Sequence, residues 1–583
     1  MSFNILSRQG ATDLVSYSIL VNGSELPEEY RIISMEVHKA VNRIPTARLV
    51  IADGDAAGQE FPASTGEHFI PGNEIEIQLG YHSEETGIFK GIITKHGIKA
   101  GRNGSSVLKL ECKDEVYKMS IGRKNRAFTE SSDSDIIKSI LDEYGLQHEV
   151  EDTSEVHEYL AQFDITDWDF INLRAEINGQ YVFVTDGEIE VKKLDFSVQP
   201  QLTLTYGSGI VDFEAEIDSR TQFNGIKSQS WNSSDQEIIE IDAAGDEGVQ
   251  PGNLSSNELA GVSGLDHYYL RHTGQISDQE LQSWADALIS RSRMAKNIGL
   301  LSIQGQADLF PGQMITLEGL GDRFNGNALV SGIRHEISGG NWITNIQYGI
   351  DFKTFAQRFR EDLQPPPASG VISAVSGLQV GIVLQLQDDP KGENRVQIKL
   401  PSLGEDFEGV WARLLSLYAG DERGFVFRPE VGDEVLVGFM HDDPRYPVIL
   451  GALHSSAKPA PLAGSDENHE KVIHTRGGMK IAFDDEKNIL EISTPSGNQI
   501  KLDEDAAEMH LEDENGNIIN MSSEGISLES AGDIVLEATG DIKISGMNVE
   551  QSASASFKAE GSAGFEASSS ATMVIRGAIV QIN

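Results

Sequence analysis

Two short clusters in the sequence carry residue types that could bind a metal or transfer protons. The first, at 441–443, reads His-Asp-Asp and places an imidazole beside two carboxylates. It falls at the end of an expected strand, directly before Pro444, so we interpret it as a solvated turn. The second, at 513–517, is similar to part of a calcium loop. Its glycine is misplaced and the closing glutamate is missing, so we assign no calcium there.

Other catalytic signatures are missing from the sequence. It contains no Gly-x-Ser-x-Gly, no P-loop and no His-Glu-x-x-His. Gly-Asp steps at 532–533 and 540–541 are better explained as corner turns than as calcium-binding β-roll repeats, which need nine-residue units. Cys112 is the single cysteine, which excludes an intrachain disulfide and a cysteine-based zinc site. We predict no catalytic residue, no metal and no cofactor.

Composition narrows the possible partners and the compartment. The 583 residues include 46 Lys+Arg against 91 Asp+Glu, a formal net charge of -45. Such a charge argues against binding nucleic acid or an anionic membrane surface. The N-terminus lacks a basic region followed by an apolar stretch, so we predict no signal peptide and synthesis in the cytoplasm. The length suggests three or four domains.

Residues 1–364 are expected to form an α+β hub or base region. Short alternating runs predict strands, and helices are expected over 132–145 and 277–297. A Pro-Gly turn leading into a strand occurs twice, at 70–77 and at 310–317, each followed by a Gly-Ile pair at 91–92 and 332–333. This internal echo predicts a duplicated domain with two barrel-like halves.

The rest of the chain divides by pattern into four segments. Three consecutive prolines predict a stiff linker at 365–370. Five short alternating runs in 371–455 predict a small closed barrel of the OB type. Residues 456–515 are expected to be a linker and the start of a needle, and 516–583 an octad repeat.

The octads place an apolar residue every eight positions, with a small or apolar partner two places on. Eight residues cannot close a coil around their own core, so the repeat predicts a three-chain intertwined β-helix, and thus a homotrimer. A disordered Ser/Ala-rich tail is the alternative, which the regular spacing disfavours. The predicted core positions are Ile518, Ile526, Ile534, Ile542, Val549, Phe557, Phe565 and Met573.

The end of the repeat is more apolar than the three serine-rich octads before it. An apolar end in water would expose side chains and strand edges, so we predict that a cap protein covers it. Inward packing that closes the last turn is the alternative. The predicted docking residues are Ile575, Ile579, Val580, Ile582 and Asn583.

The order of hub, barrel and needle resembles the spike proteins of type VI secretion and related contractile injection systems, the valine-glycine repeat protein G (VgrG) family. It equally resembles a phage tail hub fused to its central spike. Residues 423–455 resemble the family's barrel signature, while 165–183 and 222–231 resemble hub motifs, the first carried by Asp167, Trp168, Phe170 and Gly179. The signature positions are Gly424, Pro429, Gly432, Asp433, Glu434, Val435, Asp443, Pro447 and Gly451.

The resemblance implies a mainly β structural protein with two tube-like barrel domains in its hub. It implies a trimer that nucleates a hexameric inner tube, contacts baseplate components, carries a PAAR-type protein at its tip and pierces the target membrane to deliver effectors. Such a protein would leave the cell within an injection particle. A spike with cell-wall-degrading activity is one alternative, although the octads are too small to build a groove with paired carboxylates. A trimeric adhesin is another, which leaves the barrel phrase unexplained.

Overall fold

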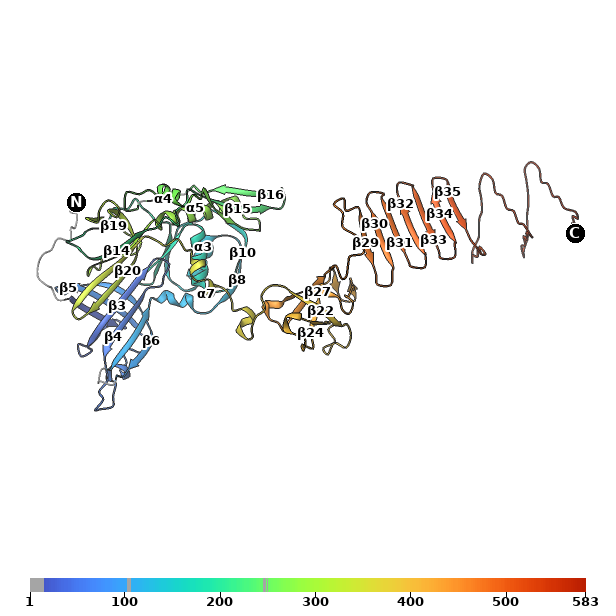
Figure 1. The fold of residues 1–583 in the computed structure, drawn as a ribbon. Helices are drawn as coiled ribbons and strands as arrows, with labels where there is room; N and C mark the ends of the chain where they lie inside the picture. The colour runs from blue at the N-terminus through green and yellow to red at the C-terminus, as the bar shows by residue number, and fades with distance from the viewer. Residues whose placement is uncertain (1–14, 102–105, 245–247, 249, 583) are drawn as a thin grey trace. The chain divides into compact units, whose positions relative to one another are not determined.

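The computed structural model describes residues 15–101, 106–244, 248 and 250–582. The chain forms two compact units, Met1–Ala374 and Val375–Asn583, and strands predominate in both, as the sequence predicts (Figure 1). The predicted linker at 365–370 includes the short 3-10 helix η2 (Pro367–Gly370) at the end of the first unit. In the described ranges, no helix has the length and apolar character needed to cross a membrane.

The first unit is organised by a thirteen-stranded sheet made of two similar halves. The first half contains β1 (Val15–Val21), β3 (Ile32–Ala40), β4 (Thr46–Ala52), β5 (Glu74–Tyr81), β6 (Glu84–Lys99) and β7 (Val107–Lys113), with β2 (Ser24–Glu25) beside β1. The second half contains β13 (Leu202–Thr205), β14 (Ile210–Ile217), β18 (Asn297–Gln304), β19 (Met314–Glu318), β20 (Gly326–Ser338) and β21 (Asn341–Tyr348).

The two halves share one topology. Their strand orders are β3-β4-β7-β6-β5-β1 and β14-β18-β21-β20-β19-β13, so in each half the second strand begins the order and the first strand ends it. All neighbouring strands are antiparallel except β13 and β19, which are parallel. The equivalent pair in the first half, β1 and β5, is antiparallel. The shared order confirms the predicted duplication. An antiparallel pairing of β3 with β20 joins the halves (Figure 1).

The Pro-Gly turns are equivalent in their hydrogen bonds. Gly72 N donates to Ile93 O at 2.9 Å, and Gly312 N donates to Val330 O at 2.8 Å. Both glycines have positive φ, 105° and 92°, which side chains rarely adopt. These bonds align Ile93 with Val330 and therefore Lys95 with Gly332. The predicted match of Gly91 with Gly332 is wrong, because in this alignment the two Gly-Ile pairs lie four residues apart.

Two β-bulges occur at equivalent positions in both halves. In the last strand pair, Thr94 of β6 and Ser331 of β20 are each the bulged residue. The Thr94 hydroxyl donates to Glu111 O at 3.0 Å, and the Ser331 hydroxyl donates to Gln347 O at 3.2 Å. A second bulge interrupts both β3–β4 and β14–β18. Because a bulge is a specific structural feature, these matches align the halves residue by residue.

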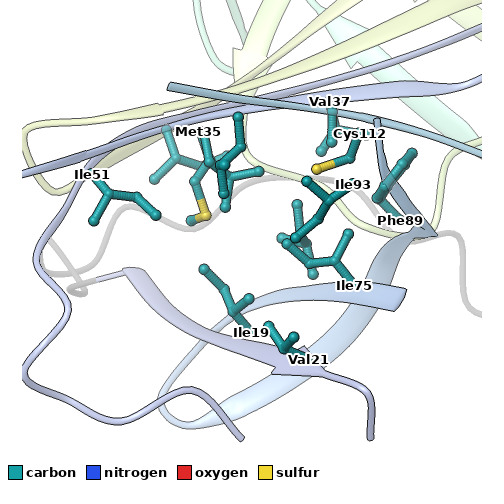
Figure 2. Close-up of a cluster of buried hydrophobic side chains, with 14 of the residues drawn as sticks. Ile19, Val21, Met35, Val37, Ile51, Ile75, Phe89, Ile93 and Cys112 are labelled. Carbon is teal, nitrogen blue, oxygen red and sulfur yellow. The ribbon is translucent and has the colours of Figure 1, made fainter. Parts of the chain in front are cut away.

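Each half has its own hydrophobic core. Alternating side chains of the first half, among them Met35, Ile75 and Cys112, fill its interior (Figure 2). Tyr348 and Leu301 lie in the equivalent core of the second half. The predicted helices are confirmed as α2 (Asp133–Glu143) and α5 (Asp278–Met294), which lie in the insertions after β7 and β14.

The insertion after β7 builds a third core. It contains η1 (Glu115–Ser120), β8 (Lys124–Ser132), α2, β9 (Gln147–Val150), β10 (Val156–Ile165), α3 (Asp167–Ile177), β11 (Tyr181–Thr185) and β12 (Glu188–Lys192). The insertion after β14 contains β15 (Gly225–Asn232), β16 (Glu237–Asp242), α4 (Ser256–Ser263), β17 (His267–Arg271) and α5. Short helices α1 (Pro62–Thr65), α6 (Phe355–Arg358) and α7 (Arg360–Leu363) lie elsewhere in the unit.

The second unit begins with a closed five-stranded barrel, which confirms the predicted OB type. Its order is β22 (Gln379–Gln385), β23 (Val396–Lys399), β24 (Val410–Leu414), β28 (Pro447–Ala452) and β27 (Glu434–Phe439). β24 pairs in parallel with β28, and all other pairs are antiparallel. A hairpin of β25 (Ala419–Gly420) and β26 (Arg423–Gly424) leaves the barrel between β24 and β27.

A seven-stranded antiparallel meander follows the barrel (Figure 1). It consists of β29 (Glu470–His474), β30 (Lys480–Asp484), β31 (Ile489–Ser493), β32 (Gln499–Asp503), β33 (Glu508–Glu512), β34 (Ile518–Ser522) and β35 (Gly525–Glu529). Only the first two predicted octad strands form, and residues 532–582 contain no strand. A strand requires a neighbour for its backbone hydrogen bonds, and in the predicted intertwined arrangement that neighbour would belong to another chain.

We expect Gly91→Ala to destabilise the hub by about 1–3 kcal/mol through overpacking. A β-carbon at Gly91 would lie 2.4 Å from the carbonyl oxygen of Lys113. Gly97→Ala, on the same strand, is the matched control, because its β-carbon would meet its nearest neighbour, Lys109 O, at 4.0 Å. Thermal unfolding of both variants measures the difference. Equal midpoints for the two variants would contradict the close approach of β6 and β7 at Gly91.

Candidate functional site

The seven-stranded meander has one apolar and one polar face. In each five-residue strand, the second and fourth side chains point to one face and the others to the opposite face. The registers place the second and fourth residues of neighbouring strands side by side, for example Ile492 opposite Ile500. This apolar face consists of Ile473, Ile481, Phe483, Leu490, Ile492, Ile500, Leu502, Met509, Leu511, Ile519, Met521, Ile526 and Leu528.

Polar side chains predominate on the opposite face, where Val472, Ala482, Ile489 and Ile518 also lie. Its central row contains Glu491, Lys501 and His510, with Asn520 and Ser527 beyond them. Lys501 forms an ion pair with Asp503 at 2.8 Å, and its hydrogen bond to that carboxylate raises the pKa of Lys501. Charged groups in such positions remain hydrated, so this face requires no partner.

The apolar face is substantially exposed in the single chain. Among its more exposed members, Ile519 is 39% exposed and Ile526 is 73% exposed. A hollow of about 500 Å³ on this sheet is lined by apolar residues that include Ile492, Leu511 and Leu528. A contiguous apolar surface of this kind is typical of an interaction site and not of a free surface.

The structure corrects the predicted needle core at its first position. Ile518 is the first residue of β34 and lies opposite Glu529, whereas Ile526 is the second residue of β35 and lies opposite Met521. Ile518 and Ile526 therefore point to opposite faces, and Ile519 and Met521 take the position that the prediction gave to Ile518. The octad spacing was misleading because the loops between the strands differ in length.

The later predicted core residues are all exposed in the single chain. Their exposed fractions lie between 50% at Met573 and 70% at Phe565, and Ile534 lines the same hollow as Leu528. Their burial in a needle core stays a prediction. The set comprises Ile534, Ile542, Val549, Phe557, Phe565 and Met573.

Sequence reasoning missed five needle strands, β29–β33. The signal was present, because apolar residues alternate with polar ones in KVIH, KIAF, ILEI, QIKL and EMHL at spacings of nine or ten residues. A search restricted to a period of eight passes over them.

The barrel signature residues of the β26–β27 region form a tight turn. Gly432 has a φ of 85°, and its N–H donates to Val383 O at 2.8 Å. The Asp433 carboxylate accepts from Glu430 N at 2.8 Å and from Lys458 Nζ at 2.9 Å. The Lys458 hydrogen bond lowers the pKa of Asp433. The turn leads into β27, where Val435 is fully buried in the barrel core.

The remaining signature residues lie in turns and strand ends. Gly424 has a φ of 141°, and a β-carbon there would lie 2.3 Å from Tyr418 O. Pro429 precedes the Gly432 turn, and Glu434 is the first residue of β27. Pro447 is buried at the start of β28, and Gly451 lies opposite Leu436 in the barrel wall.

The two clusters that could have held chemistry are structural turns. Asp443 accepts three side-chain hydrogen bonds and one backbone hydrogen bond from Arg445, and these lower the pKa of Asp443. Hydrogen bonds from the backbone and side chain of Asn517 lower the pKa of Asp513 to about 2. Within the described ranges, no three His, Cys, Asp or Glu residues gather closely enough to hold a metal ion.

The hub motif at 165–183 centres on a buried carboxylate. Asp167 starts α3, has a fully buried side chain, and accepts from Lys124 Nζ at 2.6 Å, Tyr144 OH at 2.6 Å and Gln162 Nε2 at 2.7 Å. Burial opposes the charged form, but these hydrogen bonds outweigh it and lower the pKa of Asp167. Trp168 and Phe170 pack in the third core, and Gly179 ends the motif with a φ of 69°. The motif thus ties β8, β10 and α2 to α3.

A comparison with known protein families agrees with the barrel. Residues 379–454 match the type VI secretion system/phage-baseplate injector OB domain. The type VI secretion system spike protein VgrG4b of Pseudomonas aeruginosa is 33% identical over 123 residues, 19% of this chain and 15% of that protein. Spike protein VgrG3 of Vibrio cholerae is 29% identical over 113 residues, 17% of this chain and 11% of that protein. Each match thus covers a small part of the relative's length.

Two solved structures to which this chain is similar are a phage tail protein and a secretion-system component. The prophage MuSo2 43 kDa tail protein from Shewanella oneidensis has a TM-score of 0.45 at 9% identity, covering 58% of this chain and 98% of that chain. The E. coli c3393 protein, a type VI secretion component, has a TM-score of 0.37 at 13% identity, covering 75% and 99%.

The closed OB barrel and the spike relatives place this chain in the class of VgrG-like proteins of type VI secretion systems and phage baseplates. The model of the Alg8 N-terminal domain matches residues 11–339, more than half of the chain, and the chain belongs to that family.

We expect Asp167→Asn to lower the free energy of unfolding of the hub by about 3–5 kcal/mol at pH 7, because it leaves Lys124 and Arg126 around a site without charge. A lowered folded-state pKa stabilises the fold above the unfolded pKa of about 3.9, and this contribution disappears as the pH falls through the folded value. The loss caused by Asp167→Asn should therefore shrink below about pH 4.

Urea unfolding followed by tryptophan fluorescence measures this loss. Asp152→Asn is the control, because Asp152 forms an ion pair with Lys138 but its side chain is 86% exposed. Its removal should change the free energy by less than about 1 kcal/mol. A similar small change for Asp167→Asn would show that the buried carboxylate is dispensable.

Proposed function

We propose that this protein is a homotrimeric spike and hub at the tip of a contractile injection system. In this role it nucleates the inner tube, and its needle pierces the target membrane so that effectors are delivered. The apolar face of the β29–β35 meander is the observation that carries the proposal. Its thirteen side chains lie in register along seven strands, and the polar face is already suited to water.

Three copies of the meander can cover this face by turning it inward. Burying one exposed Ile, Leu or Met contributes about 1.5–3 kcal/mol, so a row of partly exposed residues supplies a large driving force. Strands about 4.8 Å apart make the seven-stranded segment about 30 Å long. The predicted octads continue this needle. Residues 532–582 form no strand in the single chain, and in the trimer each octad would find its neighbouring strands in other copies. Closure among chains also removes exposed strand edges.

The duplicated hub supports a hexameric tube as the partner. Each chain contributes two halves of one topology, so a trimer presents six similar sheets. A hexameric tube protein and baseplate components could then bind six equivalent surfaces on a trimer. The OB barrel, held together by its signature turns, lies between hub and needle in the chain.

We propose that the protein acts structurally, without catalysis, cofactor or nucleic acid. The support is that the clustered carboxylates lie in turns or in buried ion-pair networks that hold the fold. One relative is named the actin cross-linking toxin VgrG1 of Vibrio cholerae, but the match spans 144 residues at 27% identity and only 12% of that protein. The proposed route is synthesis in the cytoplasm and export as part of the injection particle.

The apolar end of the chain is proposed to dock a PAAR-type tip protein. Ile579 and Ile582 are 82% and 85% exposed, and Ile575 and Val580 are 66% and 48% exposed. Asn583, the last predicted docking residue, lies outside the described residues. An apolar end of this kind is stabilised when a partner covers it.

We expect Ile526→Asp to prevent trimer formation, because it places three unpaired carboxylates inside the proposed needle at several kcal/mol each. Ser527→Asp is the matched control on the polar face of the same strand. Both residues are exposed in the single chain, so neither change disturbs the monomer itself. Native mass spectrometry should give three times the chain mass of 63.6 kDa for wild type and Ser527→Asp. A trimeric Ile526→Asp variant would refute the inward-facing apolar sheet.

Deletion of residues 579–583 tests the tip. We expect the truncated protein to remain trimeric, since the apolar face of the meander is untouched, and to lose binding of a PAAR-type protein. Pull-down with candidate cone proteins, with the full chain as control, measures this. Retained binding by the truncated trimer would place the docking surface elsewhere.

A further inference from the structure

Two strand edges in the hub have no neighbour within the described part of the chain. β14 pairs with β18 along one edge only, and the C-terminal part of β6, residues 95–99, pairs with β7 along one edge only. Ile98 on this part of β6 is 53% exposed. An exposed edge carrying apolar side chains promotes pairing with another chain.

The junction between the two halves is a second place where edges of this kind occur, and there they are paired with each other. β3 of the first half pairs antiparallel with β20 of the second, from Ala40 opposite Gly332 to Ser34 opposite Ser338. Val37 and His335 face each other in this pairing and are 0% and 2% exposed. The junction therefore buries its inward side chains fully.

The duplication identifies the free edges as the counterparts of this junction. β3 corresponds to β14 and β20 to β6 in the shared strand order. The matching bulges align Ile32 with Ile210 and Ile93 with Val330. It follows that Val37 corresponds to Ala215, and His335 to Ile98. The edges of β3 and β20 are thus buried against each other within the chain, whereas the equivalent edges of β14 and β6 are left open.

We propose that β14 of one copy pairs antiparallel with residues 95–99 of β6 in a second copy of this chain. The register repeats that of the internal junction, with Ala215 opposite Ile98 and Glu214 opposite Lys99. Repeating one heterologous contact closes a ring when the rotation allows it, and three copies give a ring of six halves. This pairing rests on the proposed trimer and specifies which edges join it.

The side chains on these edges are complementary in that register. Lys99 faces Glu214 directly, and Lys95 is diagonal to Glu216, so opposite charges meet at both positions. Lys95 already forms an ion pair with Glu111 at 3.6 Å, whereas among the described residues neither Lys99 nor Glu214 has an ion-pair partner within the chain. On the other face, Ile98 meets Ala215 beside Phe213, which already packs against the core of the second half. These charges and apolar contacts favour a second copy as the occupant.

Disulfide trapping tests the edges and the register together. In the full-length chain, Ala215→Cys with Ile98→Cys should form cross-links between copies, because directly opposed strand residues lie within disulfide range. Val211→Cys with Ile98→Cys is the off-register control, displaced by four residues, about 13 Å. The native Cys112 does not interfere, because it is fully buried and burial raises the pKa of its thiol to about 12.

A non-reducing gel should show a covalent trimer for the first pair, and monomers for the control and for each single variant. Charge reversal provides a second readout in the chain that carries both Ala215→Cys and Ile98→Cys. Adding Glu214→Lys alone should lower the cross-linking yield several-fold, and adding Lys99→Glu as well should restore it. Hydrogen exchange on the unmodified trimer should show residues 95–99 and 210–217 as protected as β3, which requires no variant to fold.

The outcomes separate this pairing from the proposed trimer. A particle of trimer mass without cross-links, and with rapid exchange at both edges, would overturn the pairing while leaving the trimer intact. A monomer by native mass would overturn both. Cross-linked ladders longer than three copies would show the same edges joined without ring closure, which overturns the proposed six-half ring.

Discussion

The requirement that every strand find a neighbour for its edges, and every apolar face a cover, governs this structure. Unpaired backbone groups and exposed apolar faces are costly in water, and a mainly β chain produces many of both. The OB barrel meets the requirement within itself by closing β22 onto β27. The hub meets it at the β3–β20 junction. The needle meander pairs its strands but leaves thirteen aligned apolar side chains partly or largely exposed in the single chain.

Elements whose polar groups and apolar faces are all paired or buried within the chain belong to folding, and elements left exposed point to assembly with a partner. Asp167 is an example of an interaction that belongs to folding, since its buried carboxylate is stabilised by the Lys124 cation and by hydrogen bonds from Tyr144 and Gln162 of the same chain. Such a network can form before any partner arrives. The apolar face of β29–β35 is the counterexample, because its side chains stay partly or largely exposed among the described residues of its own unit. In the proposed trimer, such a chain would fold its hub and barrel alone and would rely on other copies to cover the apolar face of its needle.

Much of this fold could be predicted from the sequence, and the errors have definite physical causes. The closed barrel follows from five short alternating runs, and α2 follows from Ser132 at its start and the apolar spacing at 136, 137, 140 and 141. The duplication was detectable from two Pro-Gly turns, yet its residue alignment was not. The number of residues from Gly72 to the bulge at Thr94 differs from the number from Gly312 to the bulge at Ser331, so equal spacing from the two turns pairs non-equivalent residues. Ile518 was misplaced for a similar reason, since loop length decides which face a residue takes.

The duplicated hub also has a consequence for how its two halves differ. Their sheets are alike strand for strand, but their insertions are not: the first half carries α1 between β4 and β5, whereas the second carries β15–β17, α4 and α5 between β14 and β18. In a ring of three copies, the sheets would repeat every sixth of a turn and the insertions only every third. A neighbour that contacts the sheets would find six equivalent binding sites, and a neighbour that contacts the insertions would find three. In the proposed trimer, two similar sheets with unequal insertions would therefore let a single polypeptide match both a sixfold and a threefold neighbour.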